Sequence, residues 1–224
     1  MYAINHAATA LLLKKEKPSV SIWPLLISVQ FVEVLWVIFN YIGIEHFTIT
    51  EGKLHLSYLP YSHSLFSGIL LAVLSYVIIR WVIKNKPLAF VFAIGVVSHV
   101  VIDLVFHEKD IQLSPFSATP VWGLGIIDHP IINFILETAY GVFCWSYFRG
   151  NRSLLVVIII FNVLDLPVML AHGKALTLFV NYPFLLPTFI LIQIVLTWYF
   201  VAKYSRRKQI SGQKRRREFV LKGD

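Results

Sequence analysis

Histidine and carboxylate side chains recur inside apolar stretches of this sequence at a spacing that could hold a metal ion. His99 and Asp103 are four residues apart, so a helix presents both on one face, one turn apart. Imidazole nitrogen and carboxylate oxygen are ligands of Zn²⁺, and they also suit Mn²⁺ and Fe²⁺. Such a pair could instead only form hydrogen bonds with neighbouring helices. It predicts a metal site if other helices contribute further ligands.

Further ionisable side chains occupy a similar depth in other apolar stretches. At about 1.5 Å of rise per residue, Glu33, His99, Asp103 and Asp165 lie roughly 18 to 24 Å from the ends of their stretches, and Glu137 reaches a similar level. A charged group in hydrocarbon costs several kcal/mol, so each one needs a partner. We therefore expect these residues to share one cavity, where a metal ion would offset the desolvation of the carboxylates.

Carboxylates that are not needed as metal ligands could act as a general base at this predicted site. A divalent metal lowers the pKa of bound water toward neutrality, and Glu33 or Glu137 could then take the proton during hydrolysis. His107 and His129 lie at the edges of apolar stretches, where they are either further members of the site or ordinary exposed residues. A structural alternative also stays open, in which the whole set only joins helices by hydrogen bonds.

Six apolar stretches must position these side chains, and each is near the roughly 20 residues needed to cross about 30 Å of hydrocarbon. They predict an all-α, polytopic membrane helix bundle with spans at 19–44, 64–83, 87–106, 131–148, 153–171 and 182–202. Each of the first, third, fourth and fifth spans carries a polar stripe at helical spacing. The sixth contributes only Gln193, so we expect it to close the bundle.

Composition excludes several classes of protein. The 224 residues are 57% hydrophobic and only 14% charged, which is unlike an ordinary soluble enzyme. The single cysteine, Cys144, excludes a disulfide framework, a Cys-rich zinc site and an iron–sulfur cluster held by this chain alone. A metal site must therefore use histidine and carboxylate ligands.

Basic residues mark one side of the predicted membrane. Of the 20 Lys and Arg residues, all but Lys53, Lys109 and Lys174 fall before the first span, after the last, or in alternate loops. The positive-inside rule then places the N and C termini in the cytoplasm and opens the site toward the outer face. A net charge of +8 would suggest nucleic-acid binding in a soluble protein, but here most of the basic residues lie at the ends of apolar stretches. We expect a lipid bilayer and no nucleic acid as partner.

Two segments flank the predicted spans. The chain begins with about ten apolar residues followed by Lys14 and Lys15, which is not the pattern of a signal peptide and predicts a short amphipathic or re-entrant helix. His6 is a metal ligand only if this helix dips inward by about 12 Å. Residues 204–224 form a basic tail beyond a single membrane domain of 1–203, and the tail either binds anionic lipid or stays solvated.

Two outer loops are long enough to fold. Residues 47–56 alternate in polarity around Glu51-Gly52, which predicts a small hairpin at the membrane surface. The loop 107–130 contains Pro115, Pro120, Gly123 and Gly125, which favour turns over a regular helix, and it could fold back as a lid.

Several of these residues also fall in motifs that resemble a known family. Asn5-His6, Ser62-His63-Ser64-Leu65 at the start of a span, and Ser98-His99-Val-Val-Ile-Asp103 in the next are similar to motifs of YdjM-like proteins. These are bacterial inner-membrane proteins described as membrane-bound metal-dependent hydrolases. The resemblance extends over about half of the chain and implies that His6, His63, His99 and Asp103 bind metal. Where the family's first long helix has a Pro-Asp-x-Asp type motif, this sequence has Gln30-Phe-Val-Glu33, which leaves Glu33 as the one candidate ligand from that helix.

Together, these features predict a multi-pass protein of a bacterial inner membrane that hydrolyses a lipid-associated or amphiphilic substrate with a divalent metal, zinc being favoured. A proton- or cation-coupled transporter or channel could use the same buried groups. Against it, no inverted repeat is detectable, and no span shows the Gly/Pro-interrupted core of broken transport helices. A non-catalytic membrane scaffold is the third possibility.

Overall fold

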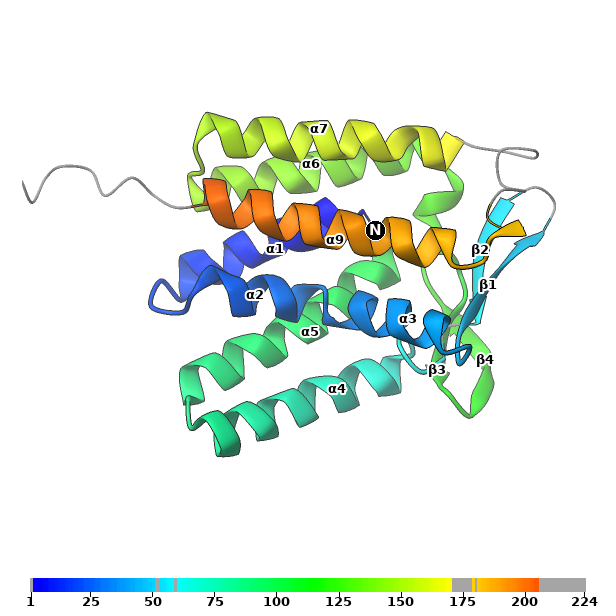
Figure 1. Cartoon of the computed structure of the whole chain (residues 1–224), viewed down its shortest axis with the longest axis horizontal. Coiled ribbons are helices and arrows are strands. Elements are labelled where there is room, and N and C mark those ends of the chain that lie inside the picture. Colours follow the sequence, from blue (N-terminus) through cyan, green and yellow to red (C-terminus); the bar gives the residue numbers. More distant parts are fainter. Residues whose placement is uncertain (1, 51–52, 59, 171–178, 180, 206–224) are drawn as a thin grey trace, which may run out of the picture.

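The computed structural model describes residues 2–50, 53–58, 60–170, 179 and 181–205 (Figure 1). Most of this part is helical, and two small hairpins complete it. The elements are α1 (Ala3–Glu16), α2 (Ile22–Val29), α3 (Phe31–Tyr41), β1 (His46–Thr50), β2 (Lys53–Tyr58), α4 (Leu65–Ile78), the π-helical turn η1 (Ile79–Ile83), α5 (Lys86–Phe106), β3 (Ile111–Ser114), β4 (Ser117–Trp122), the 3₁₀ turn η2 (Ile126–Asp128), α6 (Pro130–Phe148), α7 (Arg152–Leu170) and α9 (Leu185–Tyr204). Of the predicted basic tail, residues 206–224 lie outside the described residues.

Four helices are long and apolar enough to cross a membrane: α4 continued by η1, α5, α6 and α9. The pair α2 and α3 makes a fifth candidate if the two form one bent span. α7 occupies the predicted stretch 153–171 but is not among these candidates in the part of the chain that was described. The membrane helices are thus confirmed, whereas the count of six spans is not.

The ends of the membrane helices follow from local capping. The Ser64 side chain accepts a hydrogen bond from Ser67 N at the start of α4. Asn85 does the same for Leu88 N at the start of α5, and Pro87 stands in the first turn of that helix. Serine and asparagine satisfy backbone donors that a helix start leaves unpaired. For this reason the helices begin within a few residues of the apolar stretches that predicted them.

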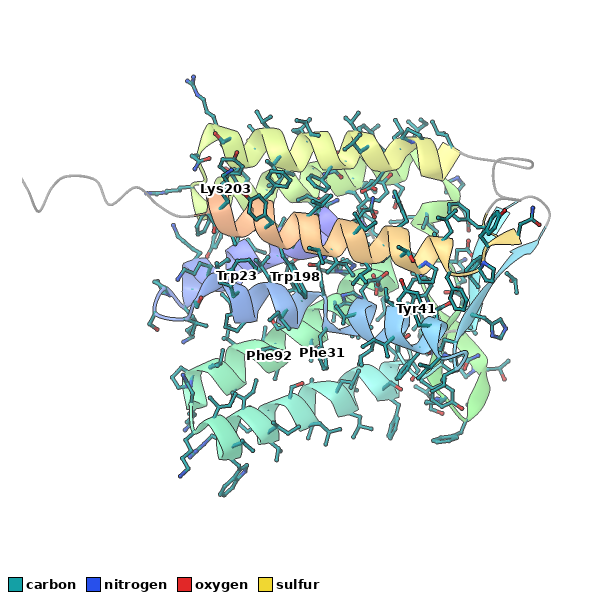
Figure 2. The ribbon with its side chains drawn as sticks, in the orientation of Figure 1. Trp23, Phe31, Tyr41, Phe92, Trp198 and Lys203 are labelled. Carbon is teal, nitrogen blue, oxygen red and sulfur yellow. The ribbon has the colours of Figure 1, made fainter. Side chains whose placement is uncertain are left out.

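The helices lie side by side and bring the basic loops to one end of the bundle (Figure 1). The α1–α2, α4–α5 and α6–α7 connections meet there with the end of α9, at the left of the view. Figure 2 shows Lys203 and Trp23 at this end and Tyr41 toward the other. Many large apolar side chains on the outer helices are exposed, among them Trp81 and Val82 at more than 70%. That surface suits lipid rather than water.

α1 lies inside the bundle. It packs against α6, α2 and α9, and every residue from Ala3 to Leu11 is buried. Its first turn lies midway along the bundle, while its last turn reaches the basic end (Figure 1). Of the two possibilities for this segment, an amphipathic surface helix is wrong, because such a helix would leave one face exposed.

The predicted span 19–44 is broken at Gln30 into α2 and α3, which meet at a bend of 56°. Neither glycine nor proline stands at the break. Two contacts tie the break to other helices: His99 Nδ1 of α5 lies 2.8 Å from Val29 O, and the side chain of Gln30 donates through Nε2 to Ala3 O of α1 at 2.8 Å. No glycine or proline interrupts the core of this span, as expected from the sequence, but the span is broken nonetheless.

Two antiparallel hairpins correct the all-α prediction. β1 pairs with β2, with His46 opposite Tyr58, as expected for this loop. β3 pairs with β4, with Ile111 opposite Trp122, where the sequence predicted only turns. Both hairpins lie at the end of the bundle away from the basic loops (Figure 1). No described contact tests whether the second one acts as a lid.

Apolar packing holds the broken helix against its neighbours. α1 supplies the centre of the main core, with Ile4 and Leu11 fully buried among residues of α2, α6 and α7 such as Leu25, Cys144 and Ile158. Phe31 of α3 meets Phe92 of α5 edge to face, with ring centroids 6.0 Å apart (Figure 2). These contacts fix α1, α3 and α5 around the polar residues that they share.

Candidate metal centre

Five ionisable side chains meet in the bundle. They come from α1, α3, α5 and the segment that precedes α4. They are His6, Glu33, His63, His99 and Asp103, referred to below as the histidine cluster. The side chains of all but Glu33 are no more than 4% exposed, whereas Glu33 is 18% exposed. The structure therefore brings together all four ligands implied by the family resemblance and the one carboxylate expected from the first long helix.

Asp103 lies at the centre of this cluster. Its Oδ1 is 3.3 Å from His6 Nε2, and its Oδ2 is 3.0 Å from His99 Nε2 and 3.8 Å from His63 Nε2. Glu33 Oε2 is 3.3 Å from His63 Nε2 and 3.6 Å from His99 Nε2. All three histidines thus direct Nε2 toward carboxylate oxygens.

The backbone fixes the ring of His99. Its Nδ1 lies 2.8 Å from Val29 O, a carbonyl that can only accept, so Nδ1 carries the proton. In a neutral imidazole this leaves Nε2 with a free lone pair directed at Glu33 and Asp103. The break at Gln30 is what frees Val29 O for this bond, because an intact helix would give it to the amide four residues later.

A hydroxyl and a carboxylate fix His63 in the same way. Glu45 Oε2 accepts the proton of Ser62 Oγ at 2.6 Å, so the hydroxyl must accept from His63 Nδ1, also at 2.6 Å. The other oxygen of Glu45 accepts the backbone N–H groups of Tyr61 and Ser62, both at 2.8 Å. In a neutral imidazole this leaves the lone pair on His63 Nε2, which lies 3.3 Å from Glu33 Oε2; if the ring is protonated, Nε2 donates to that carboxylate instead. Such outer hydrogen bonds orient the histidine ligands of metals in proteins.

Glu45 was missed by the sequence reasoning. It is 1% exposed, although it stands in a loop between α3 and β1 with no periodic pattern to mark it. Glu45 can accept a hydrogen bond from Ser62 only because the chain turns back through the β1–β2 hairpin and brings the two residues together. The only sequence signal was a carboxylate at the end of an apolar stretch, which is common in exposed loops as well.

His6 differs from the other two histidines. Its ring stacks on that of His99 with centroids 4.0 Å apart. Neither of its ring nitrogens makes a hydrogen bond with a described residue, and it is 2% exposed. His6 was a candidate ligand only if its helix dips inward, and the burial of α1 meets that condition.

His107 lies at the edge of the cluster. Its ring centroid is 6.0 Å from that of His63, and its Nδ1 is 2.7 Å from Asp110 Oδ1. Burial alone would lower the pKa of His107, but the hydrogen bond and charge of Asp110 outweigh burial and raise that pKa. His107 follows the last residue of α5, so this pair of His107 and Asp110 stands at the C-terminal end of that helix.

Glu137 lies in a second polar group instead. Its Oε2 accepts from Tyr2 N at 2.7 Å and from Asn5 Nδ2 at 2.9 Å, and its Oε1 accepts from Asn133 Nδ2 at 2.9 Å. Asn5 Nδ2 also donates to Asn162 Oδ1 at 2.8 Å. Asn5, Asn133, Glu137 and Asn162 are referred to below as the amide cluster, and all four are fully buried.

Two other sequence candidates stand apart from the histidine cluster. Asp165 of α7 accepts a hydrogen bond from Gln193 of α9, and it is 6% exposed. His129 precedes α6 and is exposed. The structure records no contact between either residue and the five members of the histidine cluster. The single shared cavity expected from helix depth is therefore divided into separate polar groups.

The histidine cluster fits a divalent metal ion. Nitrogen and oxygen ligands about 2.0 to 2.2 Å from one ion lie roughly 3.0 Å apart in octahedral and 3.5 Å apart in tetrahedral sites. Three of the nitrogen–oxygen separations here, at 3.0, 3.3 and 3.3 Å, fall in that range, and the other two are longer, at 3.6 and 3.8 Å. His99 Nε2 and both nitrogens of His6 are buried without hydrogen-bond partners among the described residues. These unpaired atoms have the chemistry of ligands for an ion.

Comparison with known proteins adds a family. A model described as YdjM inner membrane protein matches residues 46–173 of this chain. That range contains His63, His99 and Asp103, whereas His6, Glu33 and Glu45 precede it. No curated protein and no solved structure matches the chain.

Proposed function

From the premise that this chain belongs to the YdjM inner membrane protein family, whose model matches more than half of it, we propose that it is a metal-dependent hydrolase. The observation that carries this proposal is the convergence of three Nε2 atoms and two carboxylates on one small volume. His63 and His99, whose tautomers are fixed, would hold the ion with Asp103, Glu33 and His6. Zinc is the favoured ion, and manganese and iron suit the same donors.

When bound, such an ion supplies Lewis-acid chemistry that polarises an ester or phosphoryl oxygen and acidifies water. The chain's own residues divide the remaining work. Asp103 is buried against three histidines and orients them. Glu33 is the member with partial exposure, so its carboxylate is the one that would take a proton from water. Glu137 has no such part in this proposal, because three donors already occupy its oxygens.

The substrate would be lipid-associated or amphiphilic. The cluster lies inside a bundle whose outer surface is apolar, at the level where the span is broken. The basic end would face the cytoplasm by the positive-inside rule, which places the hairpins and the mouth of the site on the outer side. Residues 1–203 then form one membrane domain with a cytoplasmic basic tail that could contact anionic lipid.

Metal content tests the first part of the proposal. Protein purified in mild detergent without chelators should contain about one or two zinc, manganese or iron ions per chain, as mono- and dinuclear hydrolases do. The loaded protein should then hydrolyse members of an ester and phosphoester panel, and the Glu33→Gln variant should lose turnover. A chain that takes up none of the three ions, even when each is added back, overturns the proposal.

The broken span favours a second candidate, a proton- or cation-coupled transporter. Discontinuous helices near the middle of the membrane are typical of transport sites, and α2 and α3 meet at such a break beside the histidine cluster. In proteoliposomes, flux driven by an ion gradient and abolished by Glu33→Gln or Asp165→Asn would support transport. Turnover of an ester without any flux would support hydrolysis.

A further inference from the structure

α1 carries two polar faces that serve different clusters. Asn5 and Thr9 are four residues apart on one face, where Asn5 bonds to Glu137 and Asn162, and Thr9 Oγ1 lies 2.8 Å from Tyr140 OH. His6 is the next residue after Asn5, and it faces α5 instead. Successive helix residues are about 100° apart, so the face that contacts α6 determines where His6 points.

The start of α1 needs a partner because it lies inside the bundle. The first N–H groups of a helix have no acceptor within it, and inside a membrane no water replaces one. Glu137 Oε2 accepts Tyr2 N at 2.7 Å, and its other bonds reach Asn5 and Asn133. A carboxylate on α6 therefore holds the first turn of α1 at a fixed depth.

The fit between α1 and α6 is also close. A Cβ atom at Gly141 would lie 2.6 Å from Asn5 Oδ1 and 2.7 Å from Ile158 Cγ2, so no larger residue fits there without a shift. On the opposite side, Gln30 Nε2 donates to Ala3 O at 2.8 Å. Rotation of α1 by one residue would break these contacts and turn His6 away from Asp103.

We propose that the amide cluster positions His6, with Glu137 and Asn5 acting as positioning residues that set the depth and rotation of α1 so that His6 reaches Asp103. This proposal deepens the metal-dependent function and rests on it. It assigns Glu137 a role different from the general base expected from the sequence. The two clusters are then parts of one site, joined by the 100° step between Asn5 and His6.

Metal affinity in a double-mutant cycle tests this role. Glu137→Ala should weaken metal binding about 10- to 100-fold, the usual effect of losing support around a ligand. In a His6→Ala background, the same substitution should have no further effect, because His6 is the residue through which it acts. Glu137→Gln keeps an acceptor for Tyr2 N and should retain both metal affinity and turnover.

A matched control comes from the exposed end of α1. Tyr147 OH donates to Glu16 Oε1 at 2.5 Å, another contact between α6 and α1, and Glu16→Gln should leave metal affinity unchanged. Equal losses from Glu137→Ala with and without His6 would overturn the proposal. So would a Glu137→Gln protein that holds metal but no longer turns over substrate, because that result identifies a general base.

A readout without metal separates this proposal from the proposed function. In a Cys144→Ser, His6→Cys protein, the new thiol should react slowly with a membrane-permeant thiosulfonate, because position 6 is 2% exposed. Adding Glu137→Ala should raise the labelling rate at least about tenfold as α1 loosens. An unchanged rate overturns the positioning role, even if the chain binds no metal. Faster labelling in a protein that binds no metal would instead remove only the proposed function.

Discussion

Two buried polar clusters share this bundle and differ in how their atoms are satisfied. In the amide cluster, Glu137 accepts three hydrogen bonds and Asn5 donates to both Glu137 and Asn162. In the histidine cluster, His99 Nε2 and both ring nitrogens of His6 lack hydrogen-bond partners among the described residues. The first arrangement is what stabilises a fold. The second leaves buried polar atoms available, and such atoms are costly unless a ligand meets them.

This difference shows that a buried carboxylate is not by itself a sign of function. Glu33 and Glu137 looked equivalent in the sequence, since each lies deep in an apolar stretch. Glu33 lies beside the Nε2 atoms of two histidines, whereas Glu137 accepts from backbone and side-chain amide N–H groups. Substitutions in the histidine cluster should therefore act mainly on metal binding. Substitutions in the amide cluster should act mainly on stability and should reach the metal only through the position of α1.

The largest loss of metal is expected when the proposed ligands themselves are substituted. His99→Ala or Asp103→Ala should remove all stoichiometric metal while the protein still inserts, because Asp103 contacts all three histidines and His99 belongs to both possible ligand triplets. His129→Ala is the matched control, since that exposed histidine stands apart from the cluster. Elemental analysis of the three variants beside the wild type gives the result. Full metal content in both ligand variants would place the ion elsewhere.

A smaller loss is expected from the group that orients His63. Ser62→Ala removes the acceptor of His63 Nδ1 and should weaken metal binding about 10- to 100-fold. Ser64→Ala changes the other neighbour of His63, which is equally buried, but Ser64 caps α4 and should cost about 1 kcal/mol of stability without affecting the metal. Competition with a chelator measures both affinities. Equal affinities in the two variants would show that Ser62 does not orient the ligand.

The sequence predicted the parts of this structure that depend on local pattern. Helical spacing placed His99 and Asp103 on one face, and apolar length located most helix ends to within a few residues. The family resemblance added His6 and His63, which spacing alone left open. The YdjM family model confirms the family but does not establish the reaction.

Features that depend on contacts between residues far apart in the sequence could not be predicted in this way. The break at Gln30 has no glycine or proline to mark it in the sequence, and the contacts made there come from residues far along the chain: His99 with Val29 O, and Gln30 with Ala3 O of α1. Depth counting placed Glu137 beside Glu33, since it gives height in the membrane but not rotation about the helix. Glu45 could not be identified for a similar reason, because its partners Tyr61 and Ser62 follow 16 and 17 residues later in the chain, after a hairpin.

Stability should respond more to the amide cluster than to the histidine cluster. Asn162→Ala removes one partner of the side-chain amide nitrogen of Asn5 and one partner of its amide oxygen. It should destabilise the protein by about 1 to 3 kcal/mol. Asn40→Ala is the control, because that amide bonds only to a carbonyl of its own helix among the described contacts and is partly exposed. Denaturant unfolding in detergent compares the two. A loss at Asn162 no larger than at Asn40 would remove the contrast between the clusters.

The smallest effect, and the one of opposite sign, is expected at His6 in metal-free protein. His6→Leu removes two buried nitrogens that have no hydrogen bond to a described residue, and it fills nearly the same space with an apolar side chain. The lost stacking on His99 is worth about 0.5 to 1.5 kcal/mol, and relief of the unpaired polar atoms is of similar or larger size. Thermal unfolding should therefore show His6→Leu equal to the wild type or up to about 1 kcal/mol more stable. Added metal should reverse the order, because an ion that binds the folded state stabilises it in proportion to its affinity. A metal-free His6→Leu protein that is clearly less stable than the wild type would mean that His6 supports the fold and not the site.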